Sequence, residues 1–334
     1  MKKVIICHPV IDISSDASTI DVLDQVRLVE GSLAELGIPY TTLAITNGRV
    51  WEHATKLENA IVFNLLEAPP GAMQLQVNAT AVLELLGIPF TGASASAMWL
   101  TSDKITTRAL LQANNLPIAL GGRIALEKLA ILEQVPPPWI IKPAWEDASV
   151  GLEGNPICYT SEEAIKRTEL LTACFPNQPL LLEHFLPGRE FNVSLLEREN
   201  EVEILPIAEI VFDNFPSDIP PLVNYEAKWE SDSFTYIHTW RRFPTEDEDG
   251  ELLHSIREMS KVVWEICDLS GYARIDLRLN EAGIPHILEV NANPCLSPDA
   301  GFLAAAAQAG LSPTEVIRRI LNGKFKMANY LIGN

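Results

Sequence analysis

Apolar and polar residues follow two different spacings along the first hundred residues. Three short apolar runs have the length and composition of buried strands: residues 3–10, 41–45 and 60–65. Between them, apolar residues recur at helical spacing from 19 to 36 and from 74 to 87, and these segments stop at Gly37 and Gly87. Strands that alternate with helices predict a parallel sheet in this part of the chain.

A second unit follows, in which two helices are each succeeded by a strand. The first helix is expected from 101 to 117 with Thr101 or Ser102 as its N-cap, and the second from 161 to 175 with a capping signal at Ser161. The two predicted strands lie within residues 136–145 and 179–186.

A third unit is richer in strands. Its predicted elements are strands at 189–197 and 201–212, a helix from 246 to 269, a hairpin at 274–294 and a closing helix at 312–325. Between strand and helix, residues 214–234 have the composition of a long loop, and loops of that length in compact enzymes are often functional.

Charge and composition narrow the choice of partners. The 334 residues carry a formal net charge of −19, which repels nucleic acid and anionic membranes. The five cysteines are scattered without a CxxC pair, as expected of a reduced, cytoplasmic protein. No apolar run is long enough to span a membrane, and the N-terminal apolar run is expected to be a strand rather than a signal peptide.

Polar side chains interrupt the apolar hairpin at regular positions. Alternation places Arg274, Asp276 and Arg278 on one face of its first strand, and Ile287, Glu289 and Asn291 on one face of its second. A two-residue turn at Ala282-Gly283 would set Asp276 opposite Glu289 and Arg274 opposite Asn291.

Two carboxylates that face each other across a strand pair destabilise it unless a cation lies between them. Asp276, Glu289 and the Asn291 carbonyl are hard oxygen ligands that suit Mg²⁺. The alternative is a hydrated polar sheet face on which Arg274 neutralises the acids without a metal. The hairpin alone does not decide between the two.

A metal held by carboxylates suggests nucleotide phosphates, although neither GxxxxGK[ST] nor GxGxxG occurs. Lys142 ends a strand and precedes a loop of small residues, including Ser149, whose backbone N–H groups could approach an anion. A second strand ends near Glu183 and is followed, after a short hinge, by Glu190. Ordinary surface lysines and an exposed turn are the alternatives here.

Six segments, in this order, resemble the successive motifs of the ATP-grasp superfamily and most closely those of the D-alanine–D-alanine ligase family: SDKITTRALL, WIIKPAWEDASVGL, LLLEHFLPGREFNV, NYEAKW, ARIDLRL and ILEVNANP. The resemblance extends from about residue 64 to the C-terminus. It implies an α/β fold with three domains: a parallel-sheet domain at 1–100 and two α+β ATP-grasp domains at 101–186 and 187–334.

The resemblance also implies a role for each matching residue. Phosphates would be contacted by Lys104, Lys142 and Lys228, with Ser149 in the phosphate loop. Adenine would be held by Glu183, His184, Phe185 and Leu186, and ribose by Glu190. Mg²⁺, or Mn²⁺, would be bound by Asp276, Glu289 and Asn291, and Arg274 would face the charge that develops at the reacting carboxylate.

The implied reaction is ATP-dependent amide formation through an acyl phosphate, with small carboxylate and amine substrates and release of ADP and phosphate. A homodimer is left open. Several positions depart from the family pattern, most of them on the amino-acid side. The glycine-rich segment after the first strand is missing, Asp147 lies in the phosphate loop, Trp229 replaces a usual tyrosine, and Ala300 replaces a usual serine.

These departures favour a ligase with altered substrates. The alternatives are D-alanine–D-alanine ligase itself, and a catalytically silent protein that binds ATP. Cys295 has no histidine partner in the sequence pattern that would make it a nucleophile.

Overall fold

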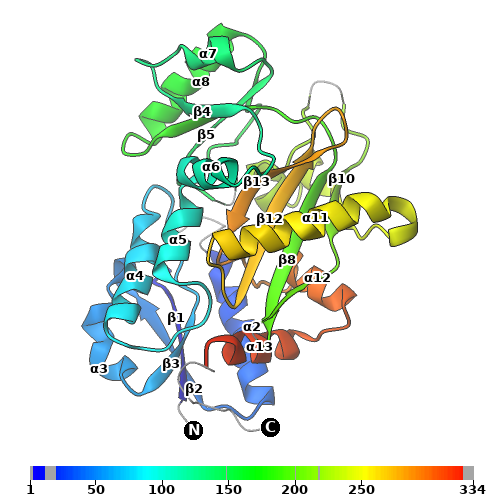
Figure 1. Ribbon diagram of the computed structural model, residues 1–334. Coiled ribbons are helices and arrows are strands. Elements are labelled where there is room, and N and C mark those ends of the chain that lie inside the picture. Colours follow the sequence, from blue (N-terminus) through cyan, green and yellow to red (C-terminus); the bar gives the residue numbers. More distant parts are fainter. Residues whose placement is uncertain (1–2, 12–19, 148, 200, 217–218, 326–334) are drawn as a thin grey trace.

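The computed structural model describes residues 3–11, 20–147, 149–199, 201–216 and 219–325. Figure 1 shows an N-terminal part below, a small sheet above, and a larger sheet beside both. The described elements form three sheets, and the strands at the sheet ends bring the predicted site residues together.

The N-terminal sheet has three parallel strands in the order β2-β1-β3, which confirms the predicted parallel sheet. Its strands are β1 (Lys3–Pro9), β2 (Tyr40–Ile45) and β3 (Ala60–Asn64). Both predicted helices are present as α2 (Val22–Glu35) and α4 (Gln74–Leu85), with the short helices η1 (Thr46–Gly48), η2 (Val50–His53) and α3 (Ala54–Leu57) between them. Strands β1 and β3 are almost wholly buried, as in a sheet covered on both faces, whereas β2 at the sheet edge is mostly exposed or half-buried.

The small sheet is antiparallel, with the order β4-β7-β5-β6. Its strands are β4 (Gly121–Ile124), β5 (Trp139–Pro143), β6 (Ile157–Cys158) and β7 (Leu180–His184). The helices of this part are α5 (Ala95–Ser102), α6 (Lys104–Ala113), α7 (Ile131–Gln134) and α8 (Ser161–Cys174). Leu171 of α8 packs with Ile141 and Leu182 of the strands in one buried cluster.

The large sheet is also antiparallel, with the order β11-β10-β8-β12-β13 and β9 paired to β8. Its strands are β8 (Glu190–Arg198), β9 (Glu201–Ile204), β10 (Ala208–Phe212), β11 (Thr239–Arg242), β12 (Tyr272–Leu279) and β13 (Pro285–Asn291). The helices are α9 (Tyr225–Trp229), α10 (Phe234–Ile237), α11 (Glu246–Ile266), α12 (Gly301–Gln308) and α13 (Pro313–Phe325). Helix α11 crosses one face of this sheet and buries Ile256 and Val263 against it (Figure 1).

Both predicted helix caps were displaced by one residue or more. Thr101 and Ser102 belong to α5, and the N-cap of α6 is Asp103, whose side chain accepts from the Ile105 N–H at 3.0 Å. The N-cap of α8 is Thr160 rather than Ser161. An N-cap residue has an extended backbone that lets its oxygen reach forward, and Asp103 and Thr160 have that conformation.

Three other expectations needed correction. The strand predicted at 201–212 is two strands, β9 and β10, separated around Pro206, because proline cannot donate to a ladder. The loop predicted at 214–234 contains α9 and the start of α10, each capped by a side chain, Asn224 or Ser233. Helices α5 and α12 were not predicted. The limits predicted for the three domains stay a prediction.

Among the described helices, none combines the length and the apolar composition needed to cross a membrane.

Candidate active site

A cavity of about 660 Å³ is lined by residues from all three parts of the chain. Every residue predicted from the sequence for the site lines it: Lys104, Lys142, Ser149, Glu183, His184, Phe185, Leu186, Glu190, Lys228, Arg274, Asp276, Glu289 and Asn291. The fold therefore brings together residues that lie up to 187 positions apart (291 − 104).

The hairpin β12–β13 has the predicted pairing at its polar positions. Asp276 lies opposite Glu289, and Arg274 lies opposite Asn291. The predicted two-residue turn is wrong, because Asn280 closes a longer loop by hydrogen-bonding to Ile284, and Leu279 pairs with Pro285.

A β-bulge compensates for the longer loop, so that the polar residues pair across the hairpin as predicted. The register shifts between Asp276 and Leu277, which leaves Leu288 as the extra residue on β13. As a result Ile287 is buried in the core, not on the face of Glu289 as predicted, and Leu288 lines the cavity instead. The bulge thus turns Glu289 and Asn291 toward the cavity.

Asp276 is neutralised by an arginine on its own strand. Arg274 donates two hydrogen bonds to it, Nε to Oδ1 and Nη2 to Oδ2, both at 2.8 Å. Asn192 on β8 donates a third, at 2.9 Å. Burial alone would lower the pKa of Arg274, but Asp276 more than reverses that effect and raises it.

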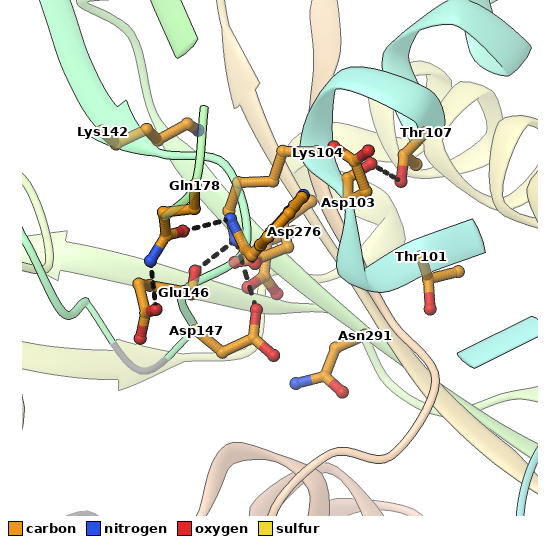
Figure 2. A network of polar contacts seen from close by, with 12 residues as sticks. Thr101, Asp103, Lys104, Thr107, Lys142, Glu146, Asp147, Gln178, Asp276 and Asn291 are labelled. Carbon is orange, nitrogen blue, oxygen red and sulfur yellow. Dashed lines mark hydrogen bonds and ion pairs between the residues drawn. The ribbon is translucent and has the colours of Figure 1, made fainter. Parts of the chain in front are cut away.

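Glu289 is neutralised by a lysine from helix α6. Lys104 Nζ lies 2.7 Å from Glu289 and 3.2 Å from Asp147, and it donates to the Glu146 carbonyl. Figure 2 shows the Lys104 ammonium next to the Glu146 carbonyl and the Asp147 carboxylate. Burial opposes ionisation of Glu289, yet Lys104 holds the pKa of that carboxyl well below its usual range.

Asp147 adds a negative charge to the loop that follows β5. Burial, together with the charge of Glu289, raises the pKa of Asp147 to about 6, although Lys104 acts in the opposite direction. The loop is held close to the end of β5, because a Cβ on Gly151 would come 2.5 Å from Pro143. Ser149 donates to the Val223 carbonyl at 2.8 Å, which ties this loop to the segment before α9.

Lys142 is positioned by a buried carboxylate. Its Nζ lies 2.8 Å from Glu183 Oε2, and Arg108 binds the other oxygen of Glu183. Burial would raise the pKa of Glu183, but Lys142 and Arg108 lower it below its usual range. The Glu183 carboxylate therefore positions Lys142. At residue 183 only the backbone groups remain to bind another ligand. Sequence reasoning missed Arg108, although it follows Lys104 by one helical turn.

Glu190 and Arg278 form a second buried pair, with 3.0 Å between their nearest charged atoms. The Arg278 guanidinium lies over the Phe185 ring, 4.8 Å from its centroid. Burial raises the pKa of Glu190, and Arg278 partly offsets this. Alternation along the strand had already placed Arg278 on the face that lines the cavity.

Lys228 differs from the other two lysines in its partners. It lies on the short helix α9, and no carboxylate pairs with it in the described part of the chain. Burial and the positive charge of Arg274 lower its pKa.

The cavity lining also includes polar residues that sequence reasoning missed, among them Asp21 and Glu67. Asp21 Oδ2 accepts from the Cys295 thiol at 3.0 Å and from the Ser297 hydroxyl at 2.7 Å. Glu67 accepts from Gln25 at 2.9 Å, and burial raises the pKa of Glu67 to about 7. Burial also raises the pKa of Cys295, which disfavours the thiolate that a nucleophile would need. Asp21 lies inside the helical segment predicted from 19 to 36, so the sequence pattern did not single it out; in the structure it is the N-cap residue of α2.

Comparison with known proteins agrees with this geometry. The family model described as D-ala D-ala ligase C-terminus matches residues 123–322, which is more than half of the chain. The chain belongs to the D-alanine–D-alanine ligase family. It is therefore an ATP-grasp enzyme of the ADP-forming carbon–nitrogen ligase class, as the resemblance implied.

Two curated relatives of this ligase family member are about equally similar to it. A D-alanine–D-alanine ligase of Gluconobacter oxydans is 31% identical over 260 residues, covering 77% of this chain and 78% of the relative. An uncharacterised protein of Sinorhizobium fredii is 30% identical over 269 residues, covering 79% of this chain and 74% of the relative.

Solved structures share the fold of this ligase over nearly its whole length. D-alanine–D-alanine ligase from Bacillus anthracis complexed with ATP has a TM-score of 0.75 at 17% identity and covers 98% of each chain. D-alanyl-alanine synthetase A from Vibrio cholerae has a TM-score of 0.74 at 18% identity and covers 96% of this chain and 98% of that one. The predicted three-part α/β architecture of the ATP-grasp type is confirmed.

Ligases of this family use ATP and a divalent metal ion. The residues present fit both, because three lysines, Arg274 and three oxygen ligands line one cavity in this chain. Among the described residues, no carboxylate lies at ion-pair distance from Lys228.

Proposed function

We propose that this ligase joins a small carboxylate to the amine of an amino-acid-like substrate, and that the pair differs from two molecules of D-alanine. The observation that supports it most is the contrast within one cavity. All residues predicted to bind ATP line this cavity. The rest of its wall includes Asp21, Glu67, Trp229 and Ala300, of which Trp229 and Ala300 depart from the family pattern.

ATP would supply the phosphoryl group that activates the carboxylate as an acyl phosphate, and a divalent cation would neutralise the phosphate oxygens. Lys104, Lys142 and Lys228 would bind those oxygens. The backbone of residues 183–186 would hold adenine, since the Glu183 side chain is paired, and Glu190 would hold the ribose. Asp276, Glu289 and Asn291 would bind Mg²⁺ or Mn²⁺.

Arg274 would stabilise the negative charge that develops when the amine adds to the activated carboxylate. Asp276 holds its guanidinium in place through two hydrogen bonds, so the donor is oriented before the substrate arrives. The segment 222–229 would cover the phosphates, because Ser149 and Gly154 are already bonded to Val223 and Glu226. A homodimer is compatible with this proposal.

D-alanine alone is expected to be a poor substrate. Trp229 brings a larger ring and no hydroxyl to the cavity wall, and Ala300 brings no hydroxyl to hold a carboxylate. The segment that stands in place of the glycine-rich one is residues 8–18, of which residues 12–18 lie outside the described residues. The measurement is ADP release with Mg²⁺ and ATP against a panel of D- and L-amino acids, singly and in pairs, with products identified by mass spectrometry.

Efficient formation of D-alanyl-D-alanine, with no better pair in the panel, would promote the D-alanine–D-alanine ligase alternative. Relatives bearing that name at about 30% identity are the reason to keep it. The silent ATP-binding alternative is disfavoured by the family membership.

A further inference from the structure

Two adjacent arginines on β11 have opposite surroundings. Arg242 is bound by carboxylates on its face of the sheet: its guanidinium lies 2.7 Å from Glu209 and 3.2 Å from Glu248. Arg241 faces the other way and lines the cavity. Within the described part of the chain, no carboxylate lies at ion-pair distance from Arg241.

The surroundings of Arg241 leave its charge available. Nη1 donates to the backbone carbonyl of Asp299 at 2.9 Å, and the Asp299 carboxylate is near but not in contact. The neighbouring cation is Arg274, which is already committed to Asp276. Arg241 keeps an exposed surface, and its partial desolvation together with the charge of Arg274 lowers its pKa, so an added anion would be favoured there.

Arg241 also lies at the start of helix α12. A Cβ on Gly301 would come 3.6 Å from Arg241 Nε, so the guanidinium is directly beside the first turn of that helix. Ala300, the N-cap residue, has no side-chain hydrogen bond to offer there. An arginine can present two parallel N–H donors to one carboxylate, and it can therefore replace a missing hydroxyl as the group that binds an anion.

We propose that Arg241 binds a free carboxylate of the amine substrate and so selects an amino acid or peptide over a simple amine. The proposal rests on the ligase function above, because it needs a second substrate whose carboxylate is not the one activated. The activated carboxylate would lie at Arg274, next to the metal ligands. The second carboxylate would lie at the rim, between Arg241 and α12, flanked by Tyr236 and Trp240.

The first test is kinetic. For the amine substrate found with the amino-acid panel, Arg241→Ala should raise KM about 10- to 100-fold, the size of a lost hydrogen bond to a charged group. The KM for ATP should stay within about twofold. Arg241→Lys should recover part of the loss. Arg198→Ala, an exposed arginine at the end of β8 and outside the cavity lining, is the matched control.

The second test uses analogues and does not need turnover. Binding of glycine, D-alanine and L-glutamate, and of the corresponding amides, is measured by calorimetry with Mg²⁺ and a non-hydrolysable ATP analogue. The wild-type protein should prefer at least one acid to its amide by about tenfold or more, and Arg241→Ala should lose that preference. Equal binding of acid and amide, no binding of any acid, or an unchanged preference in the variant would overturn the proposal.

The two tests distinguish a failure of the ligase proposal from a failure of the role assigned to Arg241. If the acid preference depends on Arg241 but no pair releases ADP, the ligase proposal fails and the carboxylate site stands. If ADP is released and Arg241→Ala behaves as Arg198→Ala does, the ligase proposal stands and the assignment of Arg241 is wrong.

Discussion

At the scale of single residues, strand alternation predicted which hairpin side chains share a face, and the resemblance supplied the other candidate residues. Alternation along β12 was enough to put Arg274, Asp276 and Arg278 on one face. It could not show that Lys104 reaches Asp147 and Glu289, since those residues are 43 and 185 positions further along the chain. Nor could it show the contact of Cys295 with Asp21, which spans 274 positions. Such pairs depend on how the three parts of the chain pack against one another, and a short stretch of sequence carries no information about that packing.

The proposed metal ligands give the first residue-scale prediction. Asp276→Asn and Glu289→Gln should each abolish ADP release, because each removes a negative charge that the metal needs. The fold should remain intact, as both side chains line a cavity rather than the core. The check is ADP release beside a far-ultraviolet circular dichroism spectrum. Normal turnover in either variant would mean that the hairpin carboxylates serve only Arg274 and Lys104.

The second residue-scale prediction concerns Glu67. Burial raises the pKa of this carboxyl from 4.5 to about 7. A carboxyl with a raised pKa is protonated more in the folded state, so the free energy of unfolding falls as pH rises from about 4.5 to 7. Glu67→Gln should remove that loss. Relative to wild type, the variant should gain at most about 3 kcal/mol by pH 8 and little at pH 4. Urea unfolding at both pH values measures this, and a constant difference would contradict it.

At the scale of elements, sequence patterns found the helices and strands better than their ends. Both caps were placed wrongly for one reason: several residues near each helix start can cap it, and only the backbone conformation decides which one does. The hairpin shows the same limit. The predicted turn was too short, and the β-bulge was not predicted. The two errors cancel, so the predicted pairing of Asp276 with Glu289 is correct.

Helix α8 offers a matched pair of variants at this scale. Thr160 accepts from the Glu163 N–H and closes a capping box, whereas Ser161 is already inside the helix. Thr160→Ala should lower the free energy of unfolding by about 1 kcal/mol, and Ser161→Ala should change it little. Chemical denaturation of both variants provides the measurement. The reverse order of effects would restore the cap predicted from the sequence.

At the scale of the whole molecule, the two ends of the chain belong to one core. Val22, Val29 and Leu33 of α2 pack in the same buried cluster as Ile317 and Ile320 of α13, and the two helices lie side by side in Figure 1. The cavity is assembled in the same way, from the end of each sheet. The parallel N-terminal sheet was predictable from its alternating strands and helices, and the three-part architecture from the resemblance of six segments to a known family. The contacts between units were not, since they join surfaces that have no common sequence signal.

The pairing of acids with bases in that cavity has a consequence for the order in which ligands can bind. Asp276 is held by Arg274 and Glu289 by Lys104, and in the described part of the chain no group of three acidic, histidine or cysteine side chains stands ready for a metal. Phosphate oxygens would draw Lys104 away and release Glu289 for the metal, while Asp276 continues to orient Arg274, so that nucleotide and metal would bind together. Free Mg²⁺ should therefore leave the melting temperature unchanged, ATP without Mg²⁺ should raise it slightly, and the two together should raise it by more than the sum. A melting curve that responds to Mg²⁺ alone would show that the metal site exists before the nucleotide arrives.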